Sequence, residues 1–360
     1  MTDRAADFHA IRITLGQTVV AEKKDALVVL EDSLQALRRI PSDSVSLILC
    51  DPPYHSTKKA NVFGDRAFRE DAHFLDWMEE YALEWQRIMR MNGTLYIFCS
   101  SQMSARLEVM MSAYLRPLNH ITWTKPNDPG YDGWKGKMNK RALRQWYPHS
   151  ERILMFEQGG YGDLTASRRS PMGAYLRECR LQSGLTAKEL TGAIGAFGRV
   201  NNGGAVANWE AGRNTPSREQ YDRMVDILEA SGQVENMLDY EDLVRAMDVD
   251  PDSEFTDVWS FTGVKPFKGK HPAEKPLDLL AHIIRTSSYP GDIVLDCFAG
   301  SGSTGIAALR LGRRAICIEI EDQWARRMAS EFTSALVEED EPTGARLTTA
   351  AATQQQSLFQ

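Results

Sequence analysis

The sequence predicts an α/β fold: a doubly wound, mostly parallel sheet with a small all-α insertion. Short apolar runs alternate with helix-like stretches before residue 160 and after residue 250, whereas the segment between them reads as helices alone. A glycine-rich turn also joins one apolar run directly to a helix. Alternating strands and helices form a parallel sheet, which binds its ligand at the carboxyl ends of the strands.

The first elements are two buried strands with a helix between them. Residues 26–30 are continuously apolar and are followed by Glu31 and Asp32. A short helix is expected over residues 33–39, and the apolar run 45–50 forms the next strand. Continuous apolar runs of this length are typical of strands covered on both faces.

The second of these strands ends in Asp51-Pro52-Pro53-Tyr54. Pro52 forces the residue before it into extended geometry, and neither proline donates a backbone N–H. The segment therefore offers carbonyl acceptors, the Asp51 carboxylate and the aromatic face of Tyr54, which suit a flat molecule with an exocyclic amine. The four residues alone are equally compatible with a Pro-Pro turn that has a capping aspartate and a packed tyrosine.

A second strong signal lies near the C-terminus. An apolar strand over residues 293–296 ends at Asp296 and runs into the turn Cys297-Phe298-Ala299-Gly300-Ser301-Gly302-Ser303-Thr304-Gly305. A helix over residues 306–311 and a strand that ends at Glu319 follow. Glycines let the backbone approach a ligand, a helix N-terminus favours electronegative groups, and an acid about 20 residues further on suits ribose hydroxyls.

Further elements complete the predicted sheet. An amphipathic helix over residues 74–89 precedes a strand at 93–99, and residues 120–123 and 152–156 are strand candidates. Four acids then follow strand ends and face one crevice: Asp32, Asp51, Asp296 and Glu319. A ligand with ribose hydroxyls and an amino-bearing base requires such acceptors.

A basic and aromatic stretch follows residue 124. The chain has a net charge of −7, yet Trp134, Trp146 and Tyr147 are interleaved here with seven cations: Lys125, Lys135, Lys137, Lys140, Arg141, Arg144 and Arg152. Surfaces that contact phosphates and stack on bases have this composition. A solvated loop with a few buried tryptophans would have the same composition.

Seven blocks follow one another in a characteristic order: Asp51-Pro52-Pro53-Tyr54, Gly93-Thr94-Leu95-Tyr96-Ile97-Phe98, Trp123-Thr124-Lys125-Pro126-Asn127, His149-Ser150-Glu151-Arg152-Ile153-Leu154, Thr256-Asp257-Val258-Trp259, His271-Pro272-Ala273-Glu274-Lys275-Pro276 and the glycine turn. Over residues 25–160 and 250–330 the chain thus resembles the DNA amino-methyltransferases of the permuted β class. It departs from them at Cys297, where the family usually has proline, and at Trp324, where tyrosine is common.

This resemblance implies a Rossmann-like methyltransferase that uses S-adenosyl-L-methionine and extrudes its target base from double-stranded DNA. Asp51 and the Pro52 carbonyl would accept the hydrogens of the target amino group, and Tyr54 would stack on the base. Aspartate at the first catalytic position favours adenine N6, with cytosine N4 as the alternative. The cofactor-binding residues would be Asp32, His271, Lys275, Asp296, Phe298, Gly300, Ser301, Gly302, Thr304 and Glu319.

The middle of the chain has a different pattern. Helices are expected over residues 172–180, from 186, over 203–210 and over 218–228. Their order, with the Trp209-Glu210 segment, resembles the lambda-repressor-like helix-turn-helix domain, whose third helix enters the major groove. Asn202 and Asn208 would then read base edges. The turn at 195–202 is longer than usual, so a structural or protein-binding unit is an alternative, as is a DNA-binding regulator with a vestigial methyltransferase half.

These segments predict four parts: residues 1–160 for the catalytic half, 161–235 for the helix-turn-helix insertion, 236–335 for the cofactor half and 336–360 for a disordered tail. The tail ends in Gln355-Gln356-Ser357-Leu358-Phe359, which resembles the short peptide that docks bacterial proteins on the sliding clamp. An accidental apolar ending is the alternative. Permuted methyltransferases often pair, so a homodimer is a further expectation.

Composition narrows the setting of the protein. No apolar run reaches the length of a membrane span, and no signal-peptide core follows the N-terminus. Five cysteines are scattered without the spacing of a metal site or a disulfide framework. We therefore expect a cytoplasmic protein without a metal ion.

Overall fold

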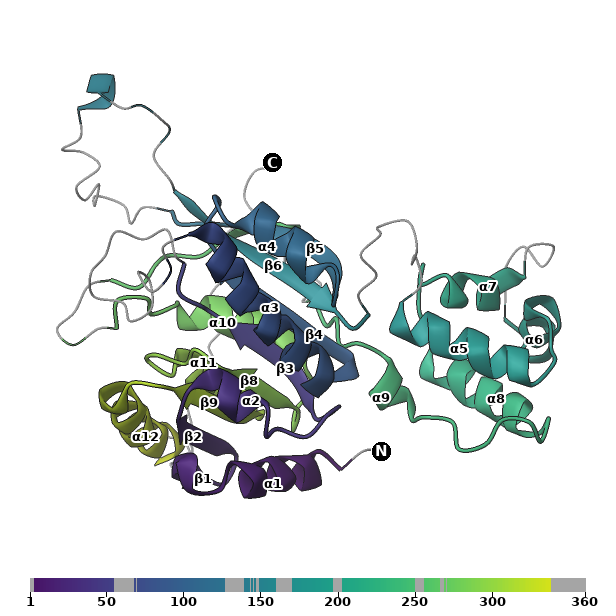
Figure 1. Cartoon of the computed structure of the whole chain (residues 1–360). Helices are drawn as coiled ribbons and strands as arrows, with labels where there is room; N and C mark the ends of the chain where they lie inside the picture. The colour runs from purple at the N-terminus through teal and green to yellow at the C-terminus, as the bar shows by residue number, and fades with distance from the viewer. Residues whose placement is uncertain are drawn as a thin grey trace, which may run out of the picture.

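The computed structural model describes residues 3–54, 68, 70–126, 139–142, 144, 146, 149–159, 170–196, 203–249, 256–265, 269 and 271–337. It contains a nine-stranded sheet in the order β1-β2-β9-β8-β3-β4-β6-β5-β7 (Figure 1). Helices cover both faces of this sheet, and a separate group of helices projects from one edge (Figure 1). The predicted doubly wound α/β fold is confirmed.

Five neighbouring parallel strands form the centre of the sheet: β2 (Ala26–Leu30), β9 (Arg314–Glu319), β8 (Ile293–Asp296), β3 (Val45–Cys50) and β4 (Met89–Cys99). The flanking strands are β6 (Ser150–Glu157), antiparallel to both β4 and β5 (Arg116–Thr124), then β7 (Val258–Ser260) and, on the far side, β1 (Val19–Lys23). Every strand expected from an apolar run is present, whereas the partly exposed edge strands β1 and β7 were not expected.

Two apolar layers hold helices against the sheet. One face carries α1 (Arg4–Leu15), α2 (Ser33–Leu37), α3 (Asp71–Ile88) and α4 (Ser104–Met111). The other face carries α10 (Leu277–Ser287), α11 (Ser303–Arg310) and α12 (Asp322–Val337). Because the inner strands are buried on both faces, their sequences are continuously apolar rather than alternating.

The middle segment forms a helical unit with its own core. We use this name for α5 (Pro171–Gln182), α6 (Ala187–Ala193), α7 (Gly204–Glu210) and α8 (Arg218–Glu229). The four expected helices are thus present. Thr186 and Glu189 form the expected capping box, with Glu189 N–H donating to Thr186 Oγ1 at 3.2 Å and Thr186 N–H donating to Glu189 Oε2 at 2.8 Å. Leu243 and Val244 also belong to this core.

The helical unit is attached at the edge of the sheet opposite to Asp51. Met91, at the start of β4, packs against its core. Asn92 Nδ2 donates to the carbonyls of Glu241 (2.7 Å) and Val244 (3.2 Å), at the short helix α9 (Tyr240–Leu243). Since β3 and β4 run parallel, the start of β4 lies at the amino edge, whereas Asp51 follows the carboxyl end of β3. Figure 1 shows the unit standing away from the sheet on this side.

The described residues also include two single-turn 3-10 helices, η1 (Gly16–Thr18) and η3 (Lys140–Ala142). All five cysteines are buried and unpaired by disulfides. In the part of the chain described here, no helix has both the length and the hydropathy to cross a bilayer.

The core of the helical unit contains one buried ion pair, which gives a test of its independence. The Arg180 guanidinium binds both carboxylate oxygens of Glu210, and these side chains are 9% and 7% exposed. Glu210→Ala leaves the buried arginine without its ion-pair partner, so we expect the free energy of unfolding of the helical unit to fall by roughly 3–5 kcal/mol. Hydrogen exchange should accelerate in α5–α8 and stay unchanged in the sheet. The exposed Glu178→Ala on α5 is the control, and equal acceleration throughout the protein would contradict an independent core.

Candidate active site

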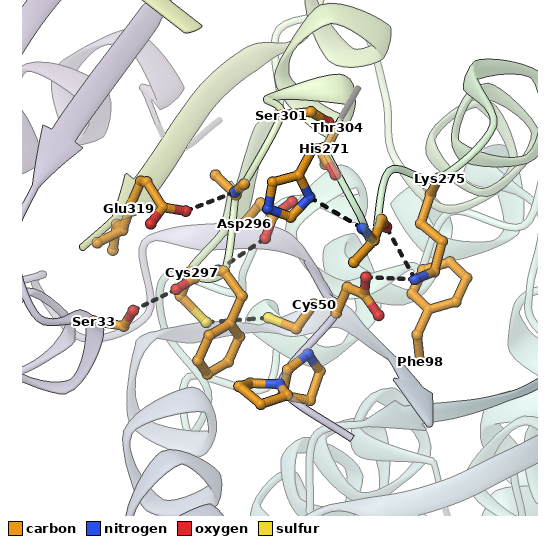
Figure 2. Close-up of a pocket in the computed structure, with 18 of the residues that line it drawn as sticks. Ser33, Cys50, Phe98, His271, Lys275, Asp296, Cys297, Ser301, Thr304 and Glu319 are labelled. Carbon is orange, nitrogen blue, oxygen red and sulfur yellow. Dashed lines mark hydrogen bonds and ion pairs between the residues drawn. The ribbon is translucent and has the colours of Figure 1, made fainter. Parts of the chain in front are cut away.

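A cavity of about 390 Å³ lies at the carboxyl edge of the central strands (Figure 2). It brings together segments that are far apart in sequence: Asp32, the tetrapeptide 51–54, residues 271–275, the glycine turn and Glu319. All four acids expected at one crevice line this cavity. Every cofactor-binding position predicted from the sequence except Gly302 also lines it.

The tetrapeptide follows β3 directly, so its position is fixed by a strand that is buried along its whole length. Asp51 Oδ2 accepts a hydrogen bond from the Lys275 ammonium. Its other oxygen, Oδ1, is buried and has no hydrogen-bond partner among the residues that the structure describes. Burial raises the pKa of the Asp51 carboxyl and the Lys275 charge opposes that rise. The site thus holds an acceptor that is desolvated and unused.

Tyr54 and Lys275 are held by an acid that the sequence analysis did not single out. The Tyr54 hydroxyl donates to Glu151 Oε2 at 2.9 Å. Lys125 donates to Glu151 Oε1, and Lys275 Nζ lies 3.9 Å from Oε2. Glu151 stands at the start of β6, which runs antiparallel, so its beginning meets the carboxyl edge. The rule that gathers acids at that edge would have found it, had the direction of this strand been known.

In the glycine turn, the backbone lies close to the side chains of other segments. Gly300 and Gly302 have positive φ angles of 48° and 79°. A Cβ atom on Gly300 would lie 2.8 Å from His271, and one on Gly302 would lie 2.4 Å from Met328. Only glycine fits both constraints. Within the turn, the Gly300 N–H donates to Glu319 Oε2 at 2.8 Å and so holds that carboxylate in place.

Asp296, at the end of β8, is a buried acid with a raised pKa. It is 4% exposed and accepts from Phe298 N–H at 3.0 Å. Burial raises its pKa to about 7, although hydrogen bonds from Thr304 and Phe298 favour the charged form. A buried carboxyl that is half protonated near neutral pH is suited to a cationic partner, which would stabilise its charged form.

Apolar side chains line part of the cavity, among them Cys297, one departure from the family pattern, whereas the other departure, Trp324, packs on the cavity residue His271. Cys297 Sγ lies 3.2 Å from Cys50 Sγ, and burial raises the pKa of the Cys50 thiol. The Phe298 ring packs on Trp77 and Tyr81, with centroids 5.8 and 5.1 Å apart. Trp324 meets the His271 ring edge-on at 4.6 Å. Cysteine and tryptophan are therefore packed in places where proline and tyrosine were expected.

The model of the DNA methylase family that covers N6 and N4 methyltransferases matches residues 45–331. The chain belongs to this family. It is similar to the DNA adenine methyltransferase YhdJ of Escherichia coli, with 28% identity over 82% of this chain and 78% of that protein. A Type II methyltransferase of Streptococcus pneumoniae, M2.DpnII, is 45% identical over 20% of this chain and 28% of its own. The PvuII cytosine-N4-specific DNA methyltransferase shares the fold, with a TM-score of 0.50 and 15% identity over 90% and 95% of the two chains.

The remaining predicted site residues of this DNA methylase are dispersed. Asp32 lines the cavity but also caps α2, accepting from Gln35 N–H at 3.1 Å. Arg141 and Arg144 are exposed, and Lys140 lies in η3. Asn208 is on the helical unit and accepts from exposed Arg213 at 3.1 Å. Outside the described residues are Lys135, Lys137, Asn202 and the tail peptide Gln355–Phe359.

The raised pKa of Asp296 predicts how the stability of the methylase depends on pH. Between its ordinary value of 3.8 and about 7, the folded protein holds more protons at this carboxyl than the unfolded chain does. The contribution of Asp296 to stability therefore falls as the pH rises through this range. Asp296→Asn removes that dependence. As the pH rises, the free energy of unfolding of the variant should therefore increase relative to that of the wild type by up to about 1.4 kcal/mol per pH unit, with no further increase above about pH 7.

Urea unfolding of both proteins between about pH 5 and pH 8 measures this difference. Asp76→Asn, at an exposed position on α3, is the control and should show no such trend. A constant difference between Asp296→Asn and the wild type would contradict the prediction.

Proposed function

We propose that this DNA methylase transfers a methyl group from S-adenosyl-L-methionine to the N6 amino group of adenine in duplex DNA. The observation that carries the proposal is Asp51 Oδ1, a buried acceptor without a partner in the described part of the chain, in a cavity that also holds the glycine turn. Membership of the family supports methyl transfer to DNA. Similarity to YhdJ, whose name states adenine specificity, supports the choice of base.

Residues of the glycine turn and of the strand ends beside it fit the cofactor. Glu319 keeps free lone pairs on its fixed carboxylate for ribose hydroxyls. Asp296 gains most from a positive charge, as the amino group of the cofactor would provide. Phe298 and the backbone at Gly300 border the same space. When bound, the cofactor supplies a methyl group activated by its sulfonium sulfur.

The tetrapeptide prepares the target nitrogen. The lone pair of an adenine amino group is delocalised into the ring, so the nitrogen must become pyramidal to attack. Asp51 Oδ1 and the Pro52 carbonyl accept its two hydrogens and favour that shape, while the buried position makes both acceptors stronger than in water. The nitrogen lone pair would form the bond to the methyl carbon as the bond between that carbon and the sulfonium sulfur breaks and leaves its electron pair on sulfur, and Asp51 would accept one proton from the nitrogen. A base inside a duplex cannot reach this cavity, so it must be extruded to stack on Tyr54.

The identity of the modified base tests the proposal. DNA from cells that express the chain should contain N6-methyladenine in one sequence context, found by nucleoside mass spectrometry and long-read sequencing. N4-methylcytosine would establish the alternative reaction instead. Asp51→Ala should lower methylation by about 10²- to 10³-fold, because the target nitrogen loses its acceptor.

We further propose that the helical unit is a helix-turn-helix insertion that contacts duplex DNA. Its helix order supports this, and Asn208 and Arg213 form an exposed polar pair on and just after α7. The attachment at the amino edge of the sheet means that such contacts would lie away from the extruded base. A regulator with a vestigial methyltransferase half is less well supported, because the cavity retains its tetrapeptide, glycine turn and acids.

Arg213→Ala should weaken DNA binding and reduce the salt dependence of the affinity by about one phosphate contact. Arg223→Ala on α8 removes the same charge from the same unit and serves as the control. Filter binding at several salt concentrations measures both. Equal effects of the two substitutions would contradict DNA contact through α7.

The clamp-binding tail, the homodimer, the cytoplasmic location, the permuted order and the four domain boundaries stay predictions.

A further inference from the structure

Glu151 occupies a central position among the charged groups of the site. Its side chain is 21% exposed, and its two oxygens contact different partners: Lys125 on Oε1, and Tyr54 with Lys275 on Oε2. Burial alone would raise the pKa of Glu151, yet Lys275 and Lys125 hold it below the ordinary value. Glu151 is therefore an anion that organises two cations and one hydroxyl.

Lys275 is shared between two carboxylates. Its side chain is 10% exposed, and its ammonium contacts Asp51 Oδ2 and lies 3.9 Å from Glu151 Oε2. The same nitrogen lies 5.0 Å from the centroid of the Phe98 ring and 5.3 Å from that of Tyr54. Figure 2 shows Lys275 reaching over Phe98 into the cavity. Its position is thus fixed by both acids together and by the aromatic walls.

Lys275 affects Asp51 in two opposed ways: it stabilises the buried carboxylate but also weakens it as an acceptor. Methyl transfer places positive charge on the target nitrogen, which the Asp51 carboxylate must stabilise. A lysine that belonged to Asp51 alone would neutralise that carboxylate. Because Glu151 takes part of the Lys275 interaction, the Asp51 carboxylate is less neutralised by that lysine and remains a more basic acceptor for the target amino group. Lys275 and Lys125 balance Asp51 and Glu151, so the four groups together are neutral.

We propose that Glu151 is a positioning residue for methyl transfer: it holds the Lys275 ammonium and the Tyr54 hydroxyl so that the unpartnered oxygen of Asp51 faces the target amino group. The inference rests on the proposed function, since it assigns the surroundings of the same tetrapeptide. Lys275 is thereby assigned to the catalytic acid, whereas the sequence resemblance placed it among the cofactor-binding residues.

The titration of Asp51 gives a direct measure of this coupling. The groups that face it are Lys275 before α10, Glu151 on β6, Tyr54 after β3 and Asp296 on β8, with the Cys99 thiol on β4. Among these, the Glu151 charge raises the pKa of Asp51. Glu151→Gln removes the charge but keeps an oxygen for the Tyr54 hydroxyl, so the pKa of Asp51 should fall.

The experiment compares wild type, Glu151→Gln and Glu151→Asp. In Glu151→Gln, kcat should fall by about 10- to 100-fold, KM for DNA should change little, and the acidic limb of the pH profile should move to lower pH. Glu151→Asp keeps the charge and should recover part of kcat and the wild-type profile. Carbon-13 NMR of aspartate carboxyls, with Asp51 assigned from Asp51→Asn, reports the pKa without any need for activity.

Glu157→Gln is the matched control. Glu157 ends the same strand at the opposite edge and also pairs with two cations, Arg116 (3.2 Å) and Arg245 (3.4 Å). This variant should lose stability but keep the wild-type pH profile. An unchanged Asp51 pKa in Glu151→Gln overturns the inference, as does a shifted pKa with wild-type kcat. If Glu151→Gln shifts the Asp51 pKa but the wild-type protein methylates no DNA, the proposed function is refuted and the coupling between Glu151 and Asp51 stands.

Discussion

The buried ion pair between Asp51 and Lys275 is the interaction on which the site depends. The two residues are 224 positions apart, one at the end of β3 and the other just before α10. Desolvating two charges costs several kcal/mol per ion unless the pairing geometry is good. The cavity therefore requires both halves of the sheet to be docked correctly. A misplaced α10 would leave Asp51 charged and unpaired, which the carboxyl would avoid by taking up a proton.

The same edge of the sheet concentrates acids in a desolvated place, and each is accommodated differently. Asp51 has an ammonium, Glu319 has the N–H groups of Gly300 and Glu321, and Asp296 retains a proton up to about pH 7. A cationic ligand would stabilise the charged form of Asp296, the acid of the three with the weakest compensation. Burial of Asp296 thus destabilises the protein without cofactor, and binding of a positively charged cofactor offsets that cost.

Local pattern in the sequence was enough for the inner strands and the glycine turn, because a strand buried on both faces is recognisable by itself. Direction and pairing were not. The role of Glu151 depends on β6 running antiparallel, and the contact of Lys275 with Asp51 depends on closure across the whole sheet. Edge strand β1 alternates exposed and half-buried residues, so its composition hardly marks it as a strand.

The place of the helical unit follows from strand direction too. β6 starts at the carboxyl edge with Glu151 and ends at the amino edge, so any chain inserted after it emerges away from the cavity. A strand of six residues is about 20 Å long, which is roughly the separation of the two edges. An insertion there leaves the cavity mouth open for a duplex. If the helical unit reads DNA, it must therefore do so several base pairs from the target, by reaching round the sheet rather than by lining the cavity.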